Sequence, residues 1–387
     1  MWMNVALVVA LLAPQDKKPA PPKDESTFVK VAEDARLPHL GFDSEGNAYV
    51  VFVRKGNIEL AISTDGGKSF GAPMTVLNSG GKDAAITNRG PRVSLDRNKR
   101  VWVSGPACLA PPNAPIVNDL YYTVSSDRGK TFSKPFMIND GAGSATQSVH
   151  GAGAGPGELH VAWVDNKKSL LYCKFDAQGK RVGRIVPITG FACEDCPPGL
   201  AVDPTGNPSV AWRETPKDPK ANRQIFLSRS TDGGKSFATT TQLNTLDSGL
   251  SECPQEPPAA AFSADGKIFA VAWMDRRDVE RDADIYWSFG PPGKLKQDTD
   301  CHDDRRYQQR RPTLAVDSEG TVWCAWEDSR QTTLRVFFTN SKIEPNIPLG
   351  DPKEGMTSLP SLAAGGGRTA IAYQSGKDIG FRVLSGR

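Results

Sequence analysis

Short runs of alternating apolar and polar residues recur along the whole chain. Examples are AYVVFV (48–53), LHVAWV (159–164) and TVWCAW (321–326). This period places successive side chains on opposite faces of a half-buried β-strand. After the N-terminal segment, no stretch has the 3.6-residue period of a long helix. Because the turn formers Gly (37) and Pro (30) are spread between the runs, the pattern predicts an all-β chain of many short strands.

The strand-like runs belong to a longer repeat. Segments 36–53, 196–213 and 310–327 align without gaps, and looser copies begin near residues 89, 147, 256 and 358. Seven units of roughly 48–60 residues have the spacing of propeller blades. Residues 27–387 are therefore predicted to form one β-propeller of about seven four-stranded blades. Six blades remain the alternative, because the third and seventh units are degenerate.

The two ends of the repeat array predict how the ring closes. The last unit stops after the strand-like DIGFRVLSG (378–386), which is its third strand. An unpaired run, TFVKV (27–31), precedes the first unit. An exposed sheet edge invites pairing with another chain. We therefore expect the N-terminal run to be the fourth strand of the last blade.

Three near-identical octapeptides, STDGGKSF (63–70), SSDRGKTF (125–132) and STDGGKSF (230–237), each follow a strand-like run. Their Asp can accept hydrogen bonds from its own turn, the Gly two residues after it can adopt angles barred to other residues, and their Phe can pack between neighbouring sheets. The pattern indicates structural staples at Ser63, Asp65, Gly67, Phe70, Ser125, Asp127, Gly129, Phe132, Ser230, Asp232, Gly234 and Phe237. The octapeptides resemble the Asp boxes, or BNR repeats, of the sialidase superfamily. That resemblance covers residues 27–387 and implies a sialidase-like propeller without identifying a substrate.

The N-terminus predicts export. Residues 2–13 (WMNVALVVALLA) are apolar but too few to span a bilayer, and a Pro-rich polar stretch follows them. We assign residues 1–26 to a signal peptide and linker, which implies a secreted or periplasmic protein. An uncleaved anchor is the alternative, since no Lys or Arg precedes the apolar run; no other membrane span is expected.

Charge and family resemblance bear on the partners. The formal charge of +3 comes without a Lys/Arg block, so nucleic acid is not an implied partner. We expect the ligand to be a glycan or an extracellular protein. We also expect the protein to be a monomer. If the octapeptide turns join the third and fourth strands at one end of the ring, the opposite end gathers charged residues from other loops. The candidates for substrate binding there are Arg36, Arg89, Arg213, Arg276, Arg277, Arg310, Arg330, Glu256, Asp275 and Glu327.

Sialidase chemistry is matched only in part. Arg36-Leu37-Pro38 is similar to the family's Arg-Ile-Pro motif, and Arg276 or Arg277 with Arg330 would complete the arginine triad that holds a substrate carboxylate. The resemblance also implies a Tyr nucleophile with a Glu partner and an Asp acid/base. No Tyr/Glu pair can be assigned, and the interval between Arg36 and the first octapeptide lacks the expected acid.

The incomplete match to sialidases, together with repeated arginine and tryptophan positions, leads to the predicted function. In the aligned units Arg89 and Arg310 stand at the position of Arg36, and this recurrence favours a structural role for the arginine. W-x-D/E-x-x-R patterns at Trp273 and Trp326 favour salt bridges within loops. The sequence therefore predicts a glycan- or protein-recognition module without standard sialidase chemistry. The alternative is a sialidase-like glycoside hydrolase with its active site at the mouth of the central channel.

Four of the seven cysteines fall in predicted loops that lead into the innermost strands of units four, five and six. For an exported chain these cysteines, Cys193, Cys196, Cys253 and Cys301, predict two disulfides with three possible connectivities. A Zn or Cu(I) site is the less favoured alternative, because a single C-x-x-C is weak evidence for metal. No cofactor and no metal are otherwise expected.

Overall fold

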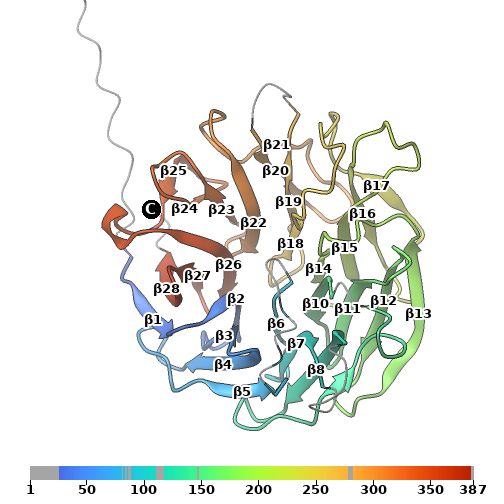
Figure 1. Ribbon diagram of the computed structural model, residues 1–387, viewed down its shortest axis with the longest axis vertical. Coiled ribbons are helices and arrows are strands. Elements are labelled where there is room, and N and C mark those ends of the chain that lie inside the picture. Colours follow the sequence, from blue (N-terminus) through green and yellow to red (C-terminus); the bar gives the residue numbers. More distant parts are fainter. Residues whose placement is uncertain are drawn as a thin grey trace, which may run out of the picture.

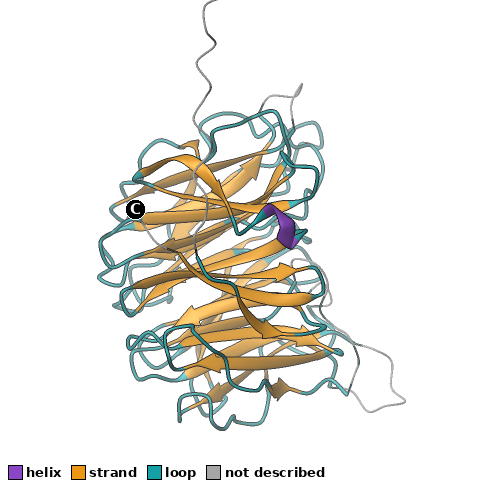
Figure 2. Cartoon of the chain, turned by 90° about the vertical axis from the view of Figure 1, so that its left-hand side faces the viewer, coloured by secondary structure: helices purple, strands orange, loops and turns teal. Residues whose placement is uncertain are grey.

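The computed structural model describes residues 26–80, 82, 85, 89–109, 117–145, 148–277 and 282–384. Within these ranges the chain forms seven antiparallel four-stranded sheets arranged around one axis (Figure 1). One short 3-10 turn, Pro352–Glu354, interrupts the otherwise all-β architecture of these residues (Figure 2). The predicted β-propeller is confirmed, and the number of blades is seven, not six. The predicted signal segment lies almost entirely outside the described residues, among which no helix is long and apolar enough to cross a membrane.

Each blade is a meander numbered outward from the axis. Blade 1 contains β2 (Arg36–Phe42), β3 (Ala48–Arg54), β4 (Asn57–Ser63) and β5 (Met74–Leu77); blade 2 contains β6 (Arg92–Leu95), β7 (Val101–Ala107), β8 (Asp119–Ser125) and β9 (Phe136–Met137). Blade 3 contains β10 (His150–Ala154), β11 (Leu159–Val164), β12 (Leu170–Phe175) and β13 (Arg181–Thr189); blade 4 contains β14 (Gly199–Val202), β15 (Pro208–Arg213), β16 (Ile225–Arg229) and β17 (Thr240–Gln242).

The last three blades complete the ring. Blade 5 contains β18 (Ala259–Phe262), β19 (Phe269–Asp275), β20 (Asp284–Gly290) and β21 (Thr299–Asp300); blade 6 contains β22 (Gln309–Val316), β23 (Val322–Asp328), β24 (Arg335–Asn340) and β25 (Ile343–Pro348). Blade 7 contains β26 (Thr357–Gly365), β27 (Arg368–Ser375), β28 (Asp378–Leu384) and the N-terminal strand β1 (Val29–Ala32).

Strand β1 closes the ring as the sequence predicts. It pairs antiparallel with β28, with Val29 opposite Phe381 and Ala32 opposite Ile379. Val31 and Ala32 are buried in the apolar cluster that joins blades 7 and 1. The last blade therefore has no unpaired outer edge at β28, and the two ends of the described chain are held together.

The core lies in the seams between blades. A fully buried tryptophan occupies the second strand of each of blades 2 to 6: Trp102, Trp163, Trp212, Trp273 and Trp326. Phe52 and Tyr373 are the buried aromatic residues of the second strands of blades 1 and 7. These side chains belong to the apolar clusters between neighbouring sheets, so the aromatic residues add buried apolar area to the seams.

The octapeptide turns join the third and fourth strands of blades 1, 2 and 4. In the first, the Asp65 carboxylate accepts hydrogen bonds from the Ser69 amide and hydroxyl at 3.0 and 2.6 Å and from the Ser63 hydroxyl at 2.7 Å. These hydrogen bonds lower the pKa of Asp65, with the Ser69 hydroxyl contributing most. Asp127 and Asp232 repeat the pattern.

The remaining octapeptide positions shape the turn and anchor it to the neighbouring blade. Gly67, Gly129 and Gly234 have φ angles of 84–89°, and a Cβ at Gly67 would clash with the ring of Phe381. Phe70 packs edge-on against Phe381 of blade 7, and Phe237 packs against Tyr172 of blade 3, with ring centroids 5.1 and 5.0 Å apart. Phe132 packs against the cluster between blades 1 and 2.

Candidate binding face at the channel mouth

Strand direction separates the two ends of the ring. The octapeptide turns lie at one end, so the loops between second and third strands and the loops that lead into each innermost strand lie at the other. We call the latter end the top face. Its centre is a cavity of about 280 Å³. The innermost strands of all seven blades line this cavity, through residues within or just before each strand.

Strained backbone shapes the mouth of this cavity. Leu37, Arg311 and Leu359 have φ angles of 59°, 53° and 50°, and each directly precedes a proline. All three sit at bulges in the innermost strands of blades 1, 6 and 7. Non-glycine residues with positive φ cost free energy and persist only where neighbouring contacts hold them.

Two buried carboxylates hold two of these bulges. Glu256, on the loop leading into blade 5, accepts the Arg311 amide at 3.1 Å. Glu327, at the end of β23, accepts the Leu359 amide at 2.7 Å and the Arg311 guanidinium at 2.5 Å. Burial raises the pKa of Glu256 to about 7, although Arg311 and Arg310 oppose the shift. Glu256 and Glu327 therefore link blades 5, 6 and 7, and neither lines the cavity.

The Trp patterns form loop salt bridges in a register that differs from the predicted one. In blade 5, the Asp275 carboxylate accepts the Trp273 indole N–H at 2.8 Å and the Arg277 guanidinium at 3.2 Å. In blade 6, the corresponding acid is Asp328, which binds Trp326 and Arg330 at 3.1 and 2.8 Å.

The residues that form these salt bridges differ in part from the predicted ones. The spacing is W-x-D-x-R in both blades, so the arginine of blade 5 is Arg277, whereas Arg276 is exposed. The acid of blade 6 is Asp328, whereas Glu327 points to the bulges. Arg277 also stacks on Tyr286, and Arg330 on Phe337, at 3.7 and 4.4 Å from the ring centroids.

Three more of the predicted arginines, Arg36, Arg89 and Arg213, also have partners within the protein. Arg36 donates to the Ala85 carbonyl at 2.7 Å. Arg89 reaches from the loop before blade 2 to Asp195 in the loop before blade 4, at 2.5 Å. Arg213 and Asp275, expected as ligand contacts, have side chains only 1% and 0% exposed and form a 3.3 Å ion pair between blades 4 and 5. Arg36, Arg277 and Arg330, the residues of the predicted triad, are thus each bound by groups of the protein itself.

A cationic residue that the sequence did not single out lines the cavity. Arg92, at the start of β6, donates to the carbonyls of Gly90 and Pro91 at 3.1 and 3.0 Å. No carboxylate in the described ranges forms an ion pair with it. Burial lowers the pKa of Arg92 to about 10, so it stays charged at neutral pH. Its only signal in the sequence was its place beside Pro91, which aligns with Pro38, Pro198, Pro258 and Pro312 in the repeated units.

Two histidines lie close to Arg92. His39 lines the cavity and its Nδ1 accepts the Val93 amide at 3.3 Å. His150 is buried and contacts the Ser104 hydroxyl through Nε2 at 3.1 Å. Burial, reinforced by the Arg92 charge, lowers the pKa of His39 well below its usual value and that of His150 to about 3. Both rings are neutral at neutral pH, so Arg92 carries the charge of this part of the cavity.

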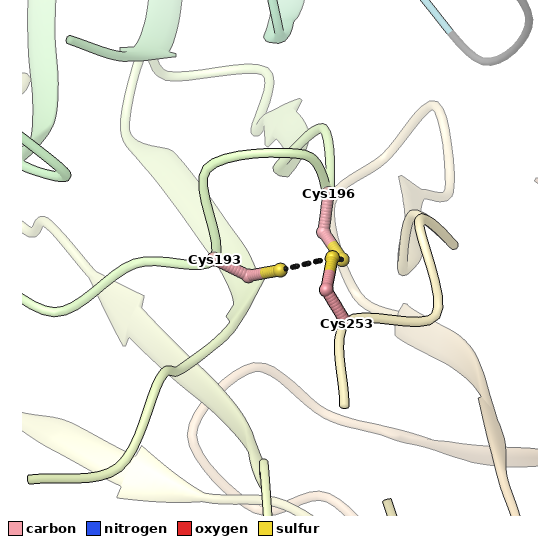
Figure 3. A group of neighbouring side chains, drawn as sticks. All are labelled: Cys193, Cys196 and Cys253. Atoms are coloured by element: carbon pink, nitrogen blue, oxygen red, sulfur yellow. Dashed lines mark hydrogen bonds between the residues drawn. The ribbon is translucent and has the colours of Figure 1, made fainter. Parts of the chain in front are cut away.

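Three of the four predicted cysteines converge on the top face (Figure 3). The Cys193 and Cys253 sulfurs are 2.8 Å apart, and the Cys196 and Cys253 sulfurs 3.6 Å apart. Hydrogen bonds from the Cys193 and Cys196 thiols lower the pKa of Cys253, whereas burial raises that of Cys196. Cys301 does not join them but packs with Cys324 between blades 5 and 6. All seven cysteines are free thiols in this structure, and the predicted two disulfides are not formed.

Comparisons with known proteins agree on the fold. No family model and no curated protein matches the chain. Among solved structures, it is similar to an α-L-arabinanase of Penicillium chrysogenum solved with arabinobiose (11% identity, TM-score 0.53, 94% of this chain and 99% of that one). It is also similar to the intramolecular trans-sialidase of Ruminococcus gnavus (13%, TM-score 0.51, 80% and 96%). A Hadza microbial sialidase is 15% identical over 76% of this chain, with a TM-score of 0.48, and the chain spans 63% of that protein's length. The chain therefore shares the β-propeller fold of the arabinanase and the trans-sialidase.

Proposed function

We propose that this protein is an exported recognition module that binds a small anionic ligand, such as a carboxylate-bearing glycan, in the cavity at the channel mouth. The observation that carries the proposal is Arg92. It is a charged guanidinium that lines the cavity and has only carbonyl partners among the described residues. A guanidinium fork matches the two oxygens of a carboxylate, so a ligand carboxylate would supply the anion that the protein does not.

The same cavity argues against hydrolysis. Glycosidases of the sialidase type need a nucleophile and an acid/base beside the scissile bond. The described residues that line the cavity include no Tyr, Asp or Glu. Arg277 and Arg330 are held by carboxylates of their own loops. These arrangements support recognition over standard sialidase chemistry, as the sequence predicts.

Ligand binding by Arg92 is directly testable. Isothermal titration of the purified chain with N-acetylneuraminate, galacturonate and the neutral disaccharide arabinobiose compares anionic with uncharged sugars. We expect an anionic sugar to bind and Arg92→Gln to weaken it by about 10- to 100-fold, the worth of a hydrogen bond to a charged group. Arg128→Gln is the matched control, because Arg128 lies in an octapeptide turn at the opposite end of the ring. Binding that is unchanged in Arg92→Gln, or no preference for anionic sugars, contradicts the proposal.

One observation favours the alternative of a glycoside hydrolase. Glu256, with a pKa of about 7, has the protonation behaviour of a general acid and lies one residue from the cavity-lining Pro257. A substrate would then have to displace the Arg311 amide that Glu256 accepts. If Glu256 is an acid, Glu256→Gln abolishes hydrolysis of a glycoside that the wild type cleaves. Under our proposal the wild type cleaves none.

A further inference from the structure

The three clustered thiols lie on two loops that the ring brings together. Cys193 and Cys196 belong to the loop before blade 4, and Cys253 to the loop before blade 5. All three sulfur atoms lie within 4.8 Å of one another, and in Figure 3 they point toward a common centre. Cys193 and Cys196 are 1% and 2% exposed, whereas Cys253 is half-buried. The centre is therefore reached from solvent past Cys253.

The loop that carries two of the thiols is fixed at several points. The Cys193 amide donates to the Arg213 carbonyl at the end of β15, at 2.9 Å, and the Cys196 amide donates to the Cys193 carbonyl. The two residues between the cysteines are also held, because Glu194 pairs with Lys168 at 3.0 Å and Asp195 with Arg89 at 2.5 Å. A loop tied to three blades presents its sulfurs with little freedom left to lose, which favours binding.

The spacing of the sulfurs suits shared coordination. With metal–sulfur bonds of about 2.3 Å, three thiolates arranged evenly around one ion lie about 4.0 Å apart. The Cys196–Cys253 separation of 3.6 Å is within about 0.4 Å of this value, and the Cys193–Cys253 pair, at 2.8 Å, must open by about 1.2 Å. A disulfide would use two of the three sulfurs and leave the third thiol beside it, poised for exchange. A metal ion uses all three.

We propose that Cys193, Cys196 and Cys253 form a binding site for a soft monovalent metal ion, Cu(I), on the top face. Thiolates select soft ions over the oxygen-seeking Ca²⁺ and Mg²⁺. A structural Zn²⁺ site is closed by four protein ligands, and in the described part of the chain no fourth His, Cys, Asp or Glu joins the cluster. Cu(I) is satisfied by three thiolates. The nearby Arg223 charge, which acts on Cys253, offsets part of the negative charge of such a complex.

The test is an anaerobic competition titration of the fully reduced, full-length chain with Cu(I) held by bathocuproine disulfonate. We expect one Cu(I) per chain to transfer to the protein. Cys193→Ser and Cys253→Ser should each weaken binding by more than about a hundredfold, because even residues that only support metal ligands are worth about 10- to 100-fold. Cys108→Ala is the matched control, a buried free thiol on blade 2 that lies outside the cluster. Thermal melts of the metal-free variants establish that each one folds.

The titration decides whether the three cysteines bind Cu(I), prefer another metal ion or bind no metal. Transfer of one Cu(I), lost in both Ser variants and kept in Cys108→Ala, supports the site. No transfer to the reduced wild type overturns it, as does equal transfer to Cys253→Ser. Displacement of Cu(I) by equimolar Zn²⁺ overturns the choice of metal. None of these results depends on whether Arg92 binds a glycan.

Discussion

The buried ion pair between Arg213 and Asp275 should contribute far more to the free energy of unfolding than ion pairs at the surface do. Arg213 closes blade 4 onto blade 5: its guanidinium bonds Asp275 at 3.3 Å, the Arg223 carbonyl at 2.9 Å and the Met274 carbonyl. Replacing it with Met keeps the length of the side chain and removes every donor. Breaking one side of a buried pair costs about 3–5 kcal/mol. Because Asp275 keeps Arg277 and Trp273 as partners, we expect the lower end, about 3 kcal/mol.

Urea unfolding followed by tryptophan fluorescence measures this cost, since the buried tryptophans report on the seams between blades. Arg229→Met is the matched control in the same blade: Arg229 pairs with Asp203 at 2.8 Å, but its side chain is 28% exposed. Pairs with an exposed partner contribute about 0–1 kcal/mol. A loss below about 1 kcal/mol for Arg213→Met, or an equal loss for both variants, would refute the reasoning that burial makes the difference.

Two further predictions concern ring closure and pH. Deleting residues 26–32 removes β1 and its buried Val31, so the free energy of unfolding should fall by about 2 kcal/mol or more; an unchanged thermal midpoint would show that β1 is dispensable. Burial lowers the pKa of all four histidines, to about 3 for His150 and His160 and to about 4 for His302, with His39 well below its usual value. The folded state thus favours the neutral rings. Their contribution to the free energy of unfolding is complete above the ordinary pKa of about 6.5. It is lost as pH falls toward 4, by about 1.4 kcal/mol per pH unit for each ring. Thermal melts between pH 7 and 4 measure this loss, and a flat profile would contradict it.

The fold was predictable because its signals are local and repeated. The aromatic column, the octapeptide turns and the alternating strands recur in register, so errors in one unit are corrected by the others. The closing role of the N-terminal run followed from one missing strand. The bounds of β1, Val29–Ala32, are displaced by only one to two residues from the predicted 27–31, because the ladder with β28 fixes where pairing begins.

The channel mouth was less predictable because its contacts depend on backbone geometry and long-range closure. A bulge with positive φ at Arg311 sends that side chain to Glu327, although the repeat singled out Arg310. The Arg89–Asp195 pair joins residues 106 positions apart, and no local pattern signals it. The prediction for the cysteines holds in part. The loops bring three of the four thiols together, whereas Cys301 lies in the next seam beside Cys324.

Whether the protein binds glycans without hydrolysing them is decided by measuring the release of free sugar. The purified wild type is incubated with sialyllactose, other glycosides and polysaccharides, and released sialic acid and reducing sugar are measured. We expect no release above a protein-free control, while N-acetylneuraminate or galacturonate still binds. Release of sialic acid that is abolished by Arg36→Lys, whose ammonium cannot reproduce the guanidinium fork, would contradict it and establish an enzyme.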